Sequence, residues 1–371
     1  MINLSYQIMT KNVGIYLYDL RHPFVGLSEF DDNIARRLAA KAKAVKEQDD
    51  IRFTFIVPQN YVGRYGEDVG YYVLNHFRAL LLNHVPSLVA LPHFDLLHLT
   101  QQQPVVRRRL APSTLLTIHD VNFFHNDISP EKEHRKVARI EHMLRVATHL
   151  SFISQFTQQD VHDHFTVSLP ERVVHNGVTR HDTLAGRRPE GLSSDSYLLM
   201  LSGWDRKKNV DEVVSMMAFL PDKQLVVAGK GSDSDRQRLQ TVIDRYHLTN
   251  VTLLGMVDEA EKTWLYQHCE AFLFTSRSEG FGLPPAEAMT CGKPVFLSRC
   301  TSLPEVGGEA ACYFTDLSPQ TMAATVSDGL RQWKSHEAAC RDAVLRQVAQ
   351  FDWDKAADAY LDYYVDILRR K

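Results

Sequence analysis

The stretch Ser276-Arg-Ser-Glu-Gly-Phe-Gly-Leu-Pro-Pro-Ala-Glu-Ala-Met-Thr-Cys-Gly-Lys-Pro-Val295 decides the fold. It follows a short apolar run that is typical of a buried strand, and it leads into a second such run. Gly280 and Gly282 allow a tight turn that can approach a ligand closely, and the consecutive prolines Pro284 and Pro285 suit the first turn of a helix. The stretch therefore predicts strand, glycine-rich turn, helix and strand, which is a unit of a parallel α/β sheet.

Two glutamates in this stretch indicate a binding site. Glu279 lies in the turn and Glu287 lies inside the following helix, so the two carboxylates should face different parts of one ligand. The helix N-terminus offers backbone N–H groups and a positive dipole end, which favour a phosphate. A glycine-rich turn with two glutamates is also typical of a plain turn before a solvated helix, but the strand on either side favours the binding site.

The same alternation of strand and helix extends outward over the whole chain. Such alternation predicts parallel sheets with right-handed crossovers. Strands are expected at 13–19, 51–57, 95–99, 113–119, 149–154 and 172–175, then at 197–202, 224–228, 251–254, 271–275 and 294–297, with helices that include 30–48, 132–147, 157–164, 210–219, 234–246 and 259–268.

A polar stretch, 179–196, is the best candidate for a linker between two domains. We therefore predict an α/β protein of two Rossmann-like, doubly wound domains, residues 1–185 and 186–352, and a final helix in 353–371 that packs back on the first domain. Ligands bind beyond the carboxyl ends of the strands in such sheets. Two sheets in tandem are thus expected to face each other across a central cleft.

Composition excludes several classes of protein. The 371 residues carry a net charge of −3, which does not favour a nucleic-acid binder. The five cysteines form no Cys-x-x-Cys pair, and their odd number indicates reduced thiols in a cytoplasm. The first residues lack the pattern of a signal peptide, and no run of 18 apolar residues predicts a membrane span.

The stretch EGFGLPPAEAMTCGKPV resembles the family-4 retaining glycosyltransferases of the GT-B fold, whose motif is two glutamates separated by seven residues. The segment Ser202-Gly-Trp-Asp-Arg-Lys-Lys-Asn209 resembles the phosphate-binding segment of the same family. Weaker similarity covers most of the chain, at 117–120, 151–154, 174–178, 226–231, 254–257 and 301–306.

The resemblance implies roles for the residues that match the motif. Glu287 would bind the ribose hydroxyls of a nucleotide, and Glu279 would contact the donor sugar near the reacting carbon. The backbone N–H groups of Phe281, Gly282 and Leu283 would hold the sugar hydroxyls and the β-phosphate. The base of the nucleotide would lie near Val257.

The resemblance also implies a pair of cations that neutralises the leaving diphosphate. Lys208 matches the lysine of the pair. The family's arginine is replaced by Trp204, so Arg206 is the substitute, with Lys207 as the alternative. A run of three cations is also typical of a solvated surface, but fixed cations at a departing diphosphate are a main source of rate.

Three residues of the first domain complete the implied site. His119 and Asp120 follow a strand, where the family has a histidine near the donor sugar and the acceptor. Gly26, in the loop after the first strand, matches a glycine next to the donor phosphate. A lone histidine after a strand is more often structural, yet the His-Asp pair in this context favours function.

The implied reaction transfers a hexose from GDP-mannose or a UDP-hexose to a glycan or lipid-linked acceptor hydroxyl with retained configuration, in surface polysaccharide or lipopolysaccharide synthesis. No metal and no further cofactor are expected, since no Asp-x-Asp pair is placed for a divalent ion. A cytoplasmic enzyme is expected, with peripheral membrane contact through the basic helix 30–48 and the cluster 107–109. An ordinary solvated helix face is the alternative interpretation of these cations.

Two other functions stay open on sequence grounds. A NAD-dependent Rossmann oxidoreductase would need Gly-x-Gly-x-x-Gly after the first strand, but Gly14 lies inside that strand and Gly26 stands alone. A catalytically inactive GT-B subunit is disfavoured because both motif glutamates, Lys208 and His119 are present.

Overall fold

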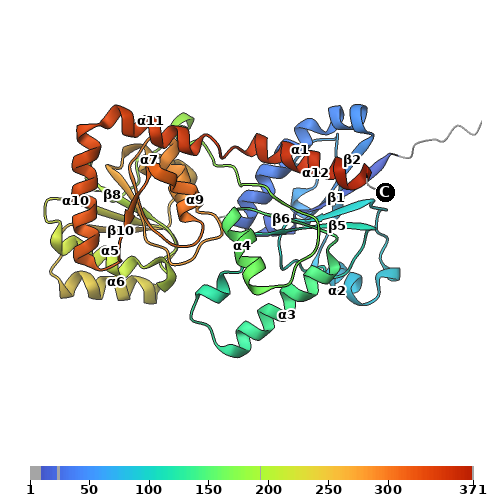
Figure 1. Ribbon diagram of the computed structural model, residues 1–371, viewed down its shortest axis with the longest axis horizontal. Coiled ribbons are helices and arrows are strands. Elements are labelled where there is room, and N and C mark those ends of the chain that lie inside the picture. The colour runs from blue at the N-terminus through green and yellow to red at the C-terminus, as the bar shows by residue number, and fades with distance from the viewer. Residues whose placement is uncertain (1–9, 23–25, 193, 370–371) are drawn as a thin grey trace, which may run out of the picture. The chain divides into compact units, whose positions relative to one another are not determined.

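The computed structural model describes residues 10–22, 26–192 and 194–369 (Figure 1). The chain divides into two compact units. The first comprises residues 1–121, 128–177 and 352–371, and the second comprises 122–127 and 178–351. The second unit thus begins at Val178, earlier in the chain than the expected boundary at 185.

The first unit is built on a seven-stranded parallel sheet of order β3-β2-β1-β4-β5-β6-β7. The strands are β1 Lys11–Tyr16, β2 Ile51–Val57, β3 Gly70–Val73, β4 Leu96–Leu99, β5 Ser113–Ile118, β6 His149–Phe152 and β7 Glu171–Val173. The main helices of the unit are α1 Gly26–Asp49, α2 His76–His84, α3 Pro130–Val146, α4 Gln155–His164 and α12 Trp353–Arg369. The short strand β3 and the helix α2 were not expected from the sequence.

The helix α1 corrects one prediction. Its buried face includes Ile34, Leu38 and Val45, as the period of the apolar residues predicts. However, the helix begins at Gly26, so this glycine is a helical residue and does not lie in a loop. Phe30, in the second turn, is buried edge-on against the ring of His119 at a centroid distance of 4.8 Å.

The second unit is built on a six-stranded sheet of order β10-β9-β8-β11-β12-β13, again with parallel pairs. The strands are β8 Leu198–Leu201, β9 Leu225–Ala228, β10 Val251–Gly255, β11 Ala271–Phe274, β12 Val295–Ser298 and β13 Cys312–Phe314. The helices are α5 Val210–Met216, α6 Asp233–Arg245, α7 Glu259–His268, α8 Leu283–Thr290, α9 Leu303–Gly307, α10 Pro319–Ser335 and α11 Glu337–Val348. The sequence prediction of two Rossmann-like α/β domains is confirmed.

The strand order has a reversal in the second unit, and it decides where a ligand can bind. The chain runs outward from β8 through β9 to β10, then returns to pair β11 with the other side of β8. The loops that follow β8 and β11 therefore lie at the carboxyl edge where the strand order reverses, which is where ligands bind in such sheets, and we call this place the crevice. These two loops contain the segments 202–209 and 275–282 that the sequence analysis singled out.

The final helix α12 packs on the first unit, beside α1 and β4 (Figure 1). A buried polar network holds it there. The His98 imidazole contacts the Tyr364 hydroxyl at 2.6 Å and the Thr117 hydroxyl at 2.7 Å, and Thr117 also contacts Tyr360 at 3.2 Å. Burial lowers the pKa of His98 to about 3, so the ring stays neutral at neutral pH.

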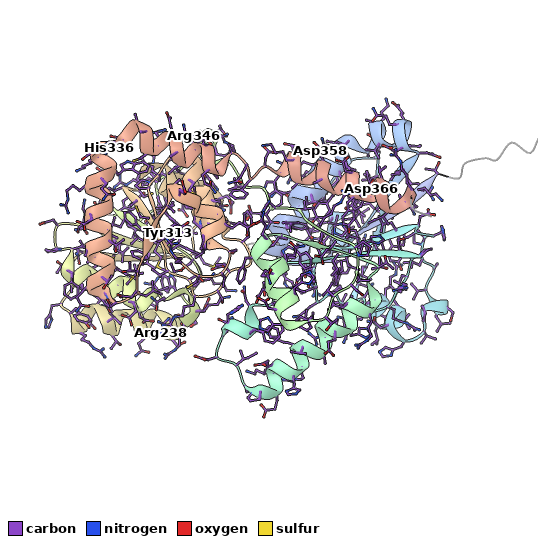
Figure 2. All side chains as sticks on the ribbon, viewed as in Figure 1. Arg238, Tyr313, His336, Arg346, Asp358 and Asp366 are labelled. Atoms are coloured by element: carbon purple, nitrogen blue, oxygen red, sulfur yellow. The ribbon has the colours of Figure 1, made fainter. Side chains whose placement is uncertain are left out.

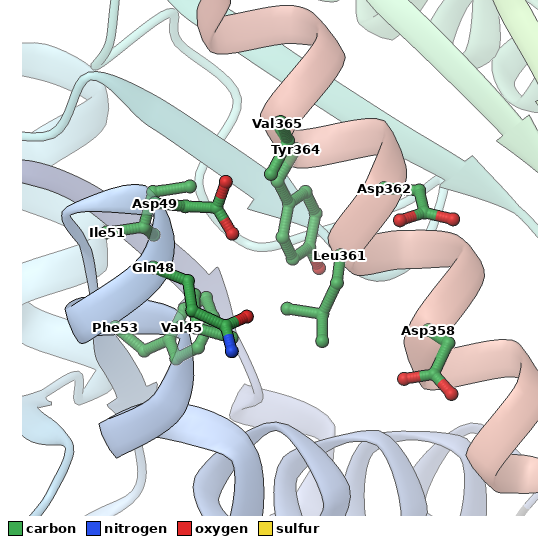
Figure 3. Close-up of a pocket in the computed structure, with 10 residues that line it drawn as sticks. All are labelled: Val45, Gln48, Asp49, Ile51, Phe53, Asp358, Leu361, Asp362, Tyr364 and Val365. Atoms are coloured by element: carbon green, nitrogen blue, oxygen red, sulfur yellow. The ribbon is translucent and has the colours of Figure 1, made fainter.

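The exposed side of α12 is acidic. Asp358 forms an ion pair with Lys41 of α1 at 2.6 Å, and Asp366 forms one with Arg172 (Figure 2). A cavity of about 200 Å³ lies between α12 and the end of α1. Figure 3 shows Leu361 pointing from α12 toward the end of α1. Among the described residues, no helix is both long and apolar enough to span a membrane.

Candidate active site

The crevice of the second unit is assembled from two loops that are bonded to each other. The Arg277 backbone N–H donates to the Lys207 carbonyl at 2.9 Å, and the Thr275 hydroxyl donates to the Lys208 carbonyl at 2.9 Å. These contacts join the loop after β11 to the loop after β8. A side chain on one loop therefore has a fixed position relative to a side chain on the other.

Lys208 and Glu279 form an ion pair in this crevice. Their side chains are 14% and 16% exposed, so the pair is largely shielded from solvent but still reachable. The Lys208 ammonium also lies 5.3 Å from the centre of the Phe274 ring. Asn209, with φ of 60°, turns the chain directly after the lysine. The structure thus brings together the lysine and the first glutamate of the predicted site.

The other predicted cations lie elsewhere. Arg206 and Lys207 are exposed, and neither forms an ion pair within the part of the chain that the structure describes. Trp204, which stands where the family has an arginine, is a buried core residue packed against Gly231, where a Cβ would lie 2.2 Å from the indole. The presence of tryptophan in place of the family's arginine is therefore explained by its packing in the core.

The loop that carries Glu279 is held by residues that follow β12. The Glu279 N–H donates to the Thr301 hydroxyl at 2.9 Å. The Ser302 hydroxyl contacts the carbonyls of Glu279 and Phe281 at 3.1 and 2.8 Å. The segment 301–306, for which no role was predicted, thus fixes the shape of the glycine-rich turn.

The turn ends in the N-terminus of α8. Gly282 has φ of 114°, which a residue with a side chain adopts only with strain. A Cβ at this position would also lie 2.8 Å from Leu303. No side chain caps α8, and Pro284 and Pro285 have no N–H to offer. Leu283 is therefore the one residue among the first three of α8 whose N–H can meet an anion.

Glu287 lies in the second turn of α8 and is 2% exposed. The Tyr266 hydroxyl donates to its Oε2 at 2.8 Å, and the Lys262 ammonium lies 3.2 Å from its Oε1. The His181 Nε2 lies 3.5 Å from the same Oε1. Burial by itself raises the pKa of this carboxyl, but Lys262, His181 and Tyr266 outweigh burial and lower the pKa to about 2. Glu287 is therefore an anion at any physiological pH.

The three partners of Glu287 were missed by the sequence analysis. Lys262 and Tyr266 are four residues apart on α7, so they share one face of that helix. His181 comes from the segment that enters the second unit. No motif marks these residues, since their contacts with Glu287 depend on tertiary packing.

Val257, the predicted neighbour of a base, follows β10 and is partly buried. The residue before it, Met256, is 62% exposed and is among the most exposed large apolar side chains of the described part of the chain. Gly255, with φ of 81°, turns the backbone at the end of β10. This edge of the sheet therefore offers an apolar surface near the crevice strands.

His119, Asp120 and Gly26 belong to the first unit, whereas the other eight predicted site residues belong to the second. His119 is 7% exposed, and its Nε2 lies 2.7 Å from the Thr100 carbonyl. A carbonyl only accepts, so Nε2 carries the hydrogen and Nδ1 keeps a lone pair. Burial lowers the pKa of His119, which favours this neutral form. Asp120 is partly buried beside it.

A pair of buried acids at the same edge was also missed. Asp31 of α1 is 1% exposed, and its Oδ2 has no hydrogen-bond partner among the described residues. Burial and the nearby Asp19 raise the pKa of Asp31 well above its usual range. Asp19 accepts a hydrogen bond from Gln101 at 2.8 Å. The first unit therefore holds a buried carboxyl on α1 whose protonated form is favoured by burial and by Asp19, which follows β1.

Comparison with known proteins relates these features to a family. Residues 186–343 match the family described as glycosyl transferases group 1. The serotype-specific mannosyltransferase WbdA of Escherichia coli is 29% identical over 188 residues, which are 47% of this chain and 22% of WbdA. The chain therefore matches less than a quarter of that relative's length.

Solved structures cover nearly the whole chain. Sucrose-phosphate synthase of Thermosynechococcus elongatus superposes with a TM-score of 0.74 over 97% of this chain and 100% of that one, at 16% identity. The Anabaena protein HepE in complex with UDP and glucose superposes with a TM-score of 0.66 over 95% and 99% of the two chains, also at 16% identity. Both are glycosyltransferases of the GT-B fold. The family match thus covers residues 186–343 of the 371, and the chain as a whole has the GT-B fold.

Proposed function

We propose that this protein is a retaining glycosyltransferase that moves a hexose from a nucleoside diphosphate sugar to an acceptor hydroxyl. The observation that carries the proposal is the ion pair of Lys208 and Glu279 at the crevice of a group 1 glycosyltransferase domain, beside the uncapped N-terminus of α8. A cation and a helix N-terminus in one crevice suit a ligand that carries a diphosphate.

The proposed chemistry follows from where charge develops. As the bond between the sugar and the diphosphate breaks, negative charge grows on the leaving phosphate and positive charge grows on the sugar ring. The Lys208 ammonium and the Leu283 N–H stabilise the leaving phosphate. The Glu279 carboxylate holds Lys208 in place and lies near the sugar. The leaving phosphate accepts the proton of the acceptor hydroxyl, which attacks from the same face, so the configuration is retained.

The nucleotide is held at the other end of α8. Glu287 is ionised and buried among fixed partners, so it can accept hydrogen bonds from ribose hydroxyls without reorganisation. Met256 and Val257 provide the apolar surface against which a base can pack. No step of the proposal uses a metal ion or a further cofactor.

We place mannose first among the sugars and GDP-mannose first among the donors. The support is the similarity to WbdA, which is a mannosyltransferase. A UDP-hexose is the second donor, supported by the fold shared with HepE, whose structure holds UDP and glucose. The proposed acceptor is a lipid-linked or polymeric glycan of the cell surface, and the proposed place is the cytoplasm.

In the first unit, His119 is proposed to meet the reacting sugars. With its hydrogen held on Nε2 by the Thr100 carbonyl, its Nδ1 can accept a hydrogen bond from a sugar hydroxyl. Asp120, next to it in the chain, would contribute an acceptor. Gly26 begins α1, and its N–H would lie at a helix N-terminus, where a phosphate oxygen is favoured.

Membrane contact through α1 would depend on the exposed Lys43 and Lys46, because the other three cations of the helix form ion pairs. Arg36 pairs with Asp32 at 2.6 Å, Arg37 with Asp354 at 3.4 Å, and Lys41 with Asp358 at 2.6 Å. The Arg109 guanidinium is likewise engaged with backbone carbonyls at the end of α3.

A different surface suits a membrane better. Four large apolar side chains of α2 and the turn after it are between 42% and 70% exposed: Phe77, Leu80, Val85 and Leu88. Arg107 and Arg108 adjoin them, since the Arg107 N–H donates to the Asn83 side chain at 2.8 Å. We propose that this lipid-docking surface rests on an anionic membrane, where a lipid-linked acceptor is found.

The function is tested with purified protein and a panel of GDP, UDP, ADP, dTDP, CMP and NAD in a thermal-shift measurement. A ligand at about 100 times its dissociation constant should add roughly 2.7 kcal/mol of stability. We expect a shift with GDP or UDP that is lost in Glu287→Ala, followed by turnover of the matching nucleotide sugar. Stabilisation by NAD alone would instead support an oxidoreductase, and nucleotide binding without turnover would support an inactive subunit.

A further inference from the structure

The chain enters the second unit through a segment that lies along α7. We call residues 178–187 the linker segment, since they directly follow Gly177, the last residue of the first unit before residue 352. The Gln267 side chain donates to two of its carbonyls, those of His181 at 2.7 Å and Leu184 at 2.9 Å. Gly186 lies against Trp264, where a Cβ would be 2.8 Å from the backbone. The linker segment is therefore fixed to α7 at several points.

His181 is a buried side chain of this segment, with no exposed surface. Its Nδ1 lies 2.8 Å from the Thr263 hydroxyl, which fixes the plane of the ring. Its Nε2 is directed at Glu287 Oε1 over 3.5 Å and has no hydrogen-bond partner among the described residues. A buried ring nitrogen without a hydrogen-bond partner lowers the stability of the fold, so such nitrogens are rare and their presence calls for an explanation.

The backbone of His181 is connected to Glu287 as well. The His181 N–H donates to the Thr290 hydroxyl at 3.1 Å, and that hydroxyl donates to the Glu287 carbonyl at 2.6 Å. The same residue of the linker segment thus meets both ends of Glu287, its carbonyl through Thr290 and its carboxylate through the imidazole. A shift of the linker segment would be passed to this glutamate by two routes.

We infer that His181 is a positioning residue that orients the Glu287 carboxylate for the ribose of the nucleotide and couples the linker segment to the donor site. This inference rests on the proposed function, in which Glu287 binds the ribose. The Thr263 hydroxyl donates to the Glu259 carbonyl at 2.8 Å, so the His181 Nδ1 donates to Thr263. With a hydrogen on Nε2 as well, the ring is an imidazolium whose contact with the carboxylate is attractive, and a closure of a few tenths of an ångström gives a charge-assisted hydrogen bond. Lys262 and Tyr266 hold the carboxylate from the α7 side, and His181 holds it from the linker side.

A matched pair of substitutions separates this role from simple packing. In His181→Asn, the side-chain amide can still reach Thr263 from the position of Nδ1 but is too short to reach Glu287. In His181→Gln, the longer amide can place a donor near the position of Nε2. Tyr197→Phe is the control, because it removes another buried hydrogen bond to α7, from Tyr197 to the Leu265 carbonyl at 3.1 Å, without touching Glu287.

Dissociation constants for GDP and UDP are measured by calorimetry on the full chain, with turnover at saturating donor. His181→Asn should weaken binding of the preferred nucleotide about tenfold, the scale of one hydrogen bond to a charged group, with turnover changed much less. His181→Gln should recover most of that loss. Tyr197→Phe should bind the nucleotide as the parent does.

The decisive comparison combines His181→Asn with Glu287→Gln. If His181 acts through Glu287, the double variant binds no more weakly than Glu287→Gln alone. If the two losses multiply, or if His181→Gln is as weak as His181→Asn, the inference is wrong while the donor role of Glu287 stands. If Glu287→Gln alone binds GDP and UDP like the parent, the donor role of Glu287 fails, and this inference falls with it.

Discussion

The Lys208 ammonium is paired with the Glu279 carboxylate, and the backbone beside the pair is bonded as well, from Arg277 to Lys207. The two residues are 71 positions apart in the sequence, and they lie in the loops that follow the neighbouring strands β8 and β11. The Lys208 ammonium, which would contact a leaving diphosphate, is therefore held in position by the fold before a ligand binds, so binding does not have to order this side chain.

Replacing Lys208 should remove most of the turnover. We expect Lys208→Met to lower kcat roughly 100-fold, since one fixed electrostatic contact to a leaving group is on this scale. The control is Lys207→Met, because Lys207 is exposed and has no ion pair with a described residue. Release of GDP or UDP from the nucleotide sugar measures both. Equal activity of the two variants would contradict the role given to Lys208.

The two motif glutamates should give different defects. Glu287→Ala should raise the Kd for the nucleoside diphosphate about tenfold or more, because ribose hydroxyls lose a charged acceptor. Glu279→Ala should bind the free nucleotide nearly as well as the parent but lose turnover, because its contacts lie with Lys208 and the sugar. Calorimetry and steady-state kinetics separate the two, and a uniform loss in both variants would argue against this division.

The low pKa of Glu287 predicts how stability depends on pH. Its folded pKa of about 2 is below the unfolded value, so its ionisation stabilises the fold fully above the unfolded pKa of about 4.3, and this contribution is lost as the pH falls toward 2. We expect the difference in Tm between the parent and Glu287→Gln to be constant from pH 6 to 8 and to shrink below about pH 4. A difference that grows in acid would show that the carboxyl is protonated in the fold at neutral pH.

The hydroxyl of Tyr364 should be needed for the stability of the first unit. Tyr364→Phe leaves His98 Nδ1 buried without its partner, which costs about 1–3 kcal/mol of unfolding free energy. Denaturant unfolding followed by fluorescence measures this cost. Nucleotide affinity should not change, since Glu287 and Lys208 lie in the other unit. Loss of nucleotide binding without loss of stability would contradict the prediction.

Substitutions in the lipid-docking surface should reduce binding of the protein to membranes. Phe77→Ser combined with Leu88→Ser should abolish sedimentation with vesicles that contain anionic lipids, because both side chains are exposed and apolar. Lys43→Glu combined with Lys46→Glu, on the exposed face of α1, is the control and should sediment like the parent. If the α1 variant is the one that is released, the basic helix is the contact after all.

The regular part of the fold could be predicted from the sequence because each strand is a short apolar run followed by a polar loop. β3 and α2 could not, since Gly70–Val73 is a four-residue strand without alternation and α2 exposes apolar residues that a helix normally buries. The strand β13 and the helices α9, α10 and α11 were not predicted either. The start of α1 was predicted too late because a glycine favours a turn, whereas the helix begins at Gly26.

The candidate site was predictable only where residues share a motif. Lys208 and Glu279 lie in two motifs, and the structure brings them together. His181, Lys262 and Tyr266 contact Glu287 from segments that are 21 to 106 residues away in the chain, so no local pattern could identify them. Trp204 shows the opposite case, because a departure from the family motif is explained by its packing against Gly231.

The position of α12 has a consequence for biosynthesis. Its buried face, which includes Trp353, Tyr360 and Tyr364, covers the first unit, yet the ribosome makes it only after the entire second unit. Until α12 is made, the apolar surface of the first unit that α12 covers stays exposed, while about half of the chain is still being translated. Nascent chains with such exposed apolar surface are prone to aggregate. A nonsense or frameshift mutation just before the codons of α12 would thus damage the part of the protein that was made first.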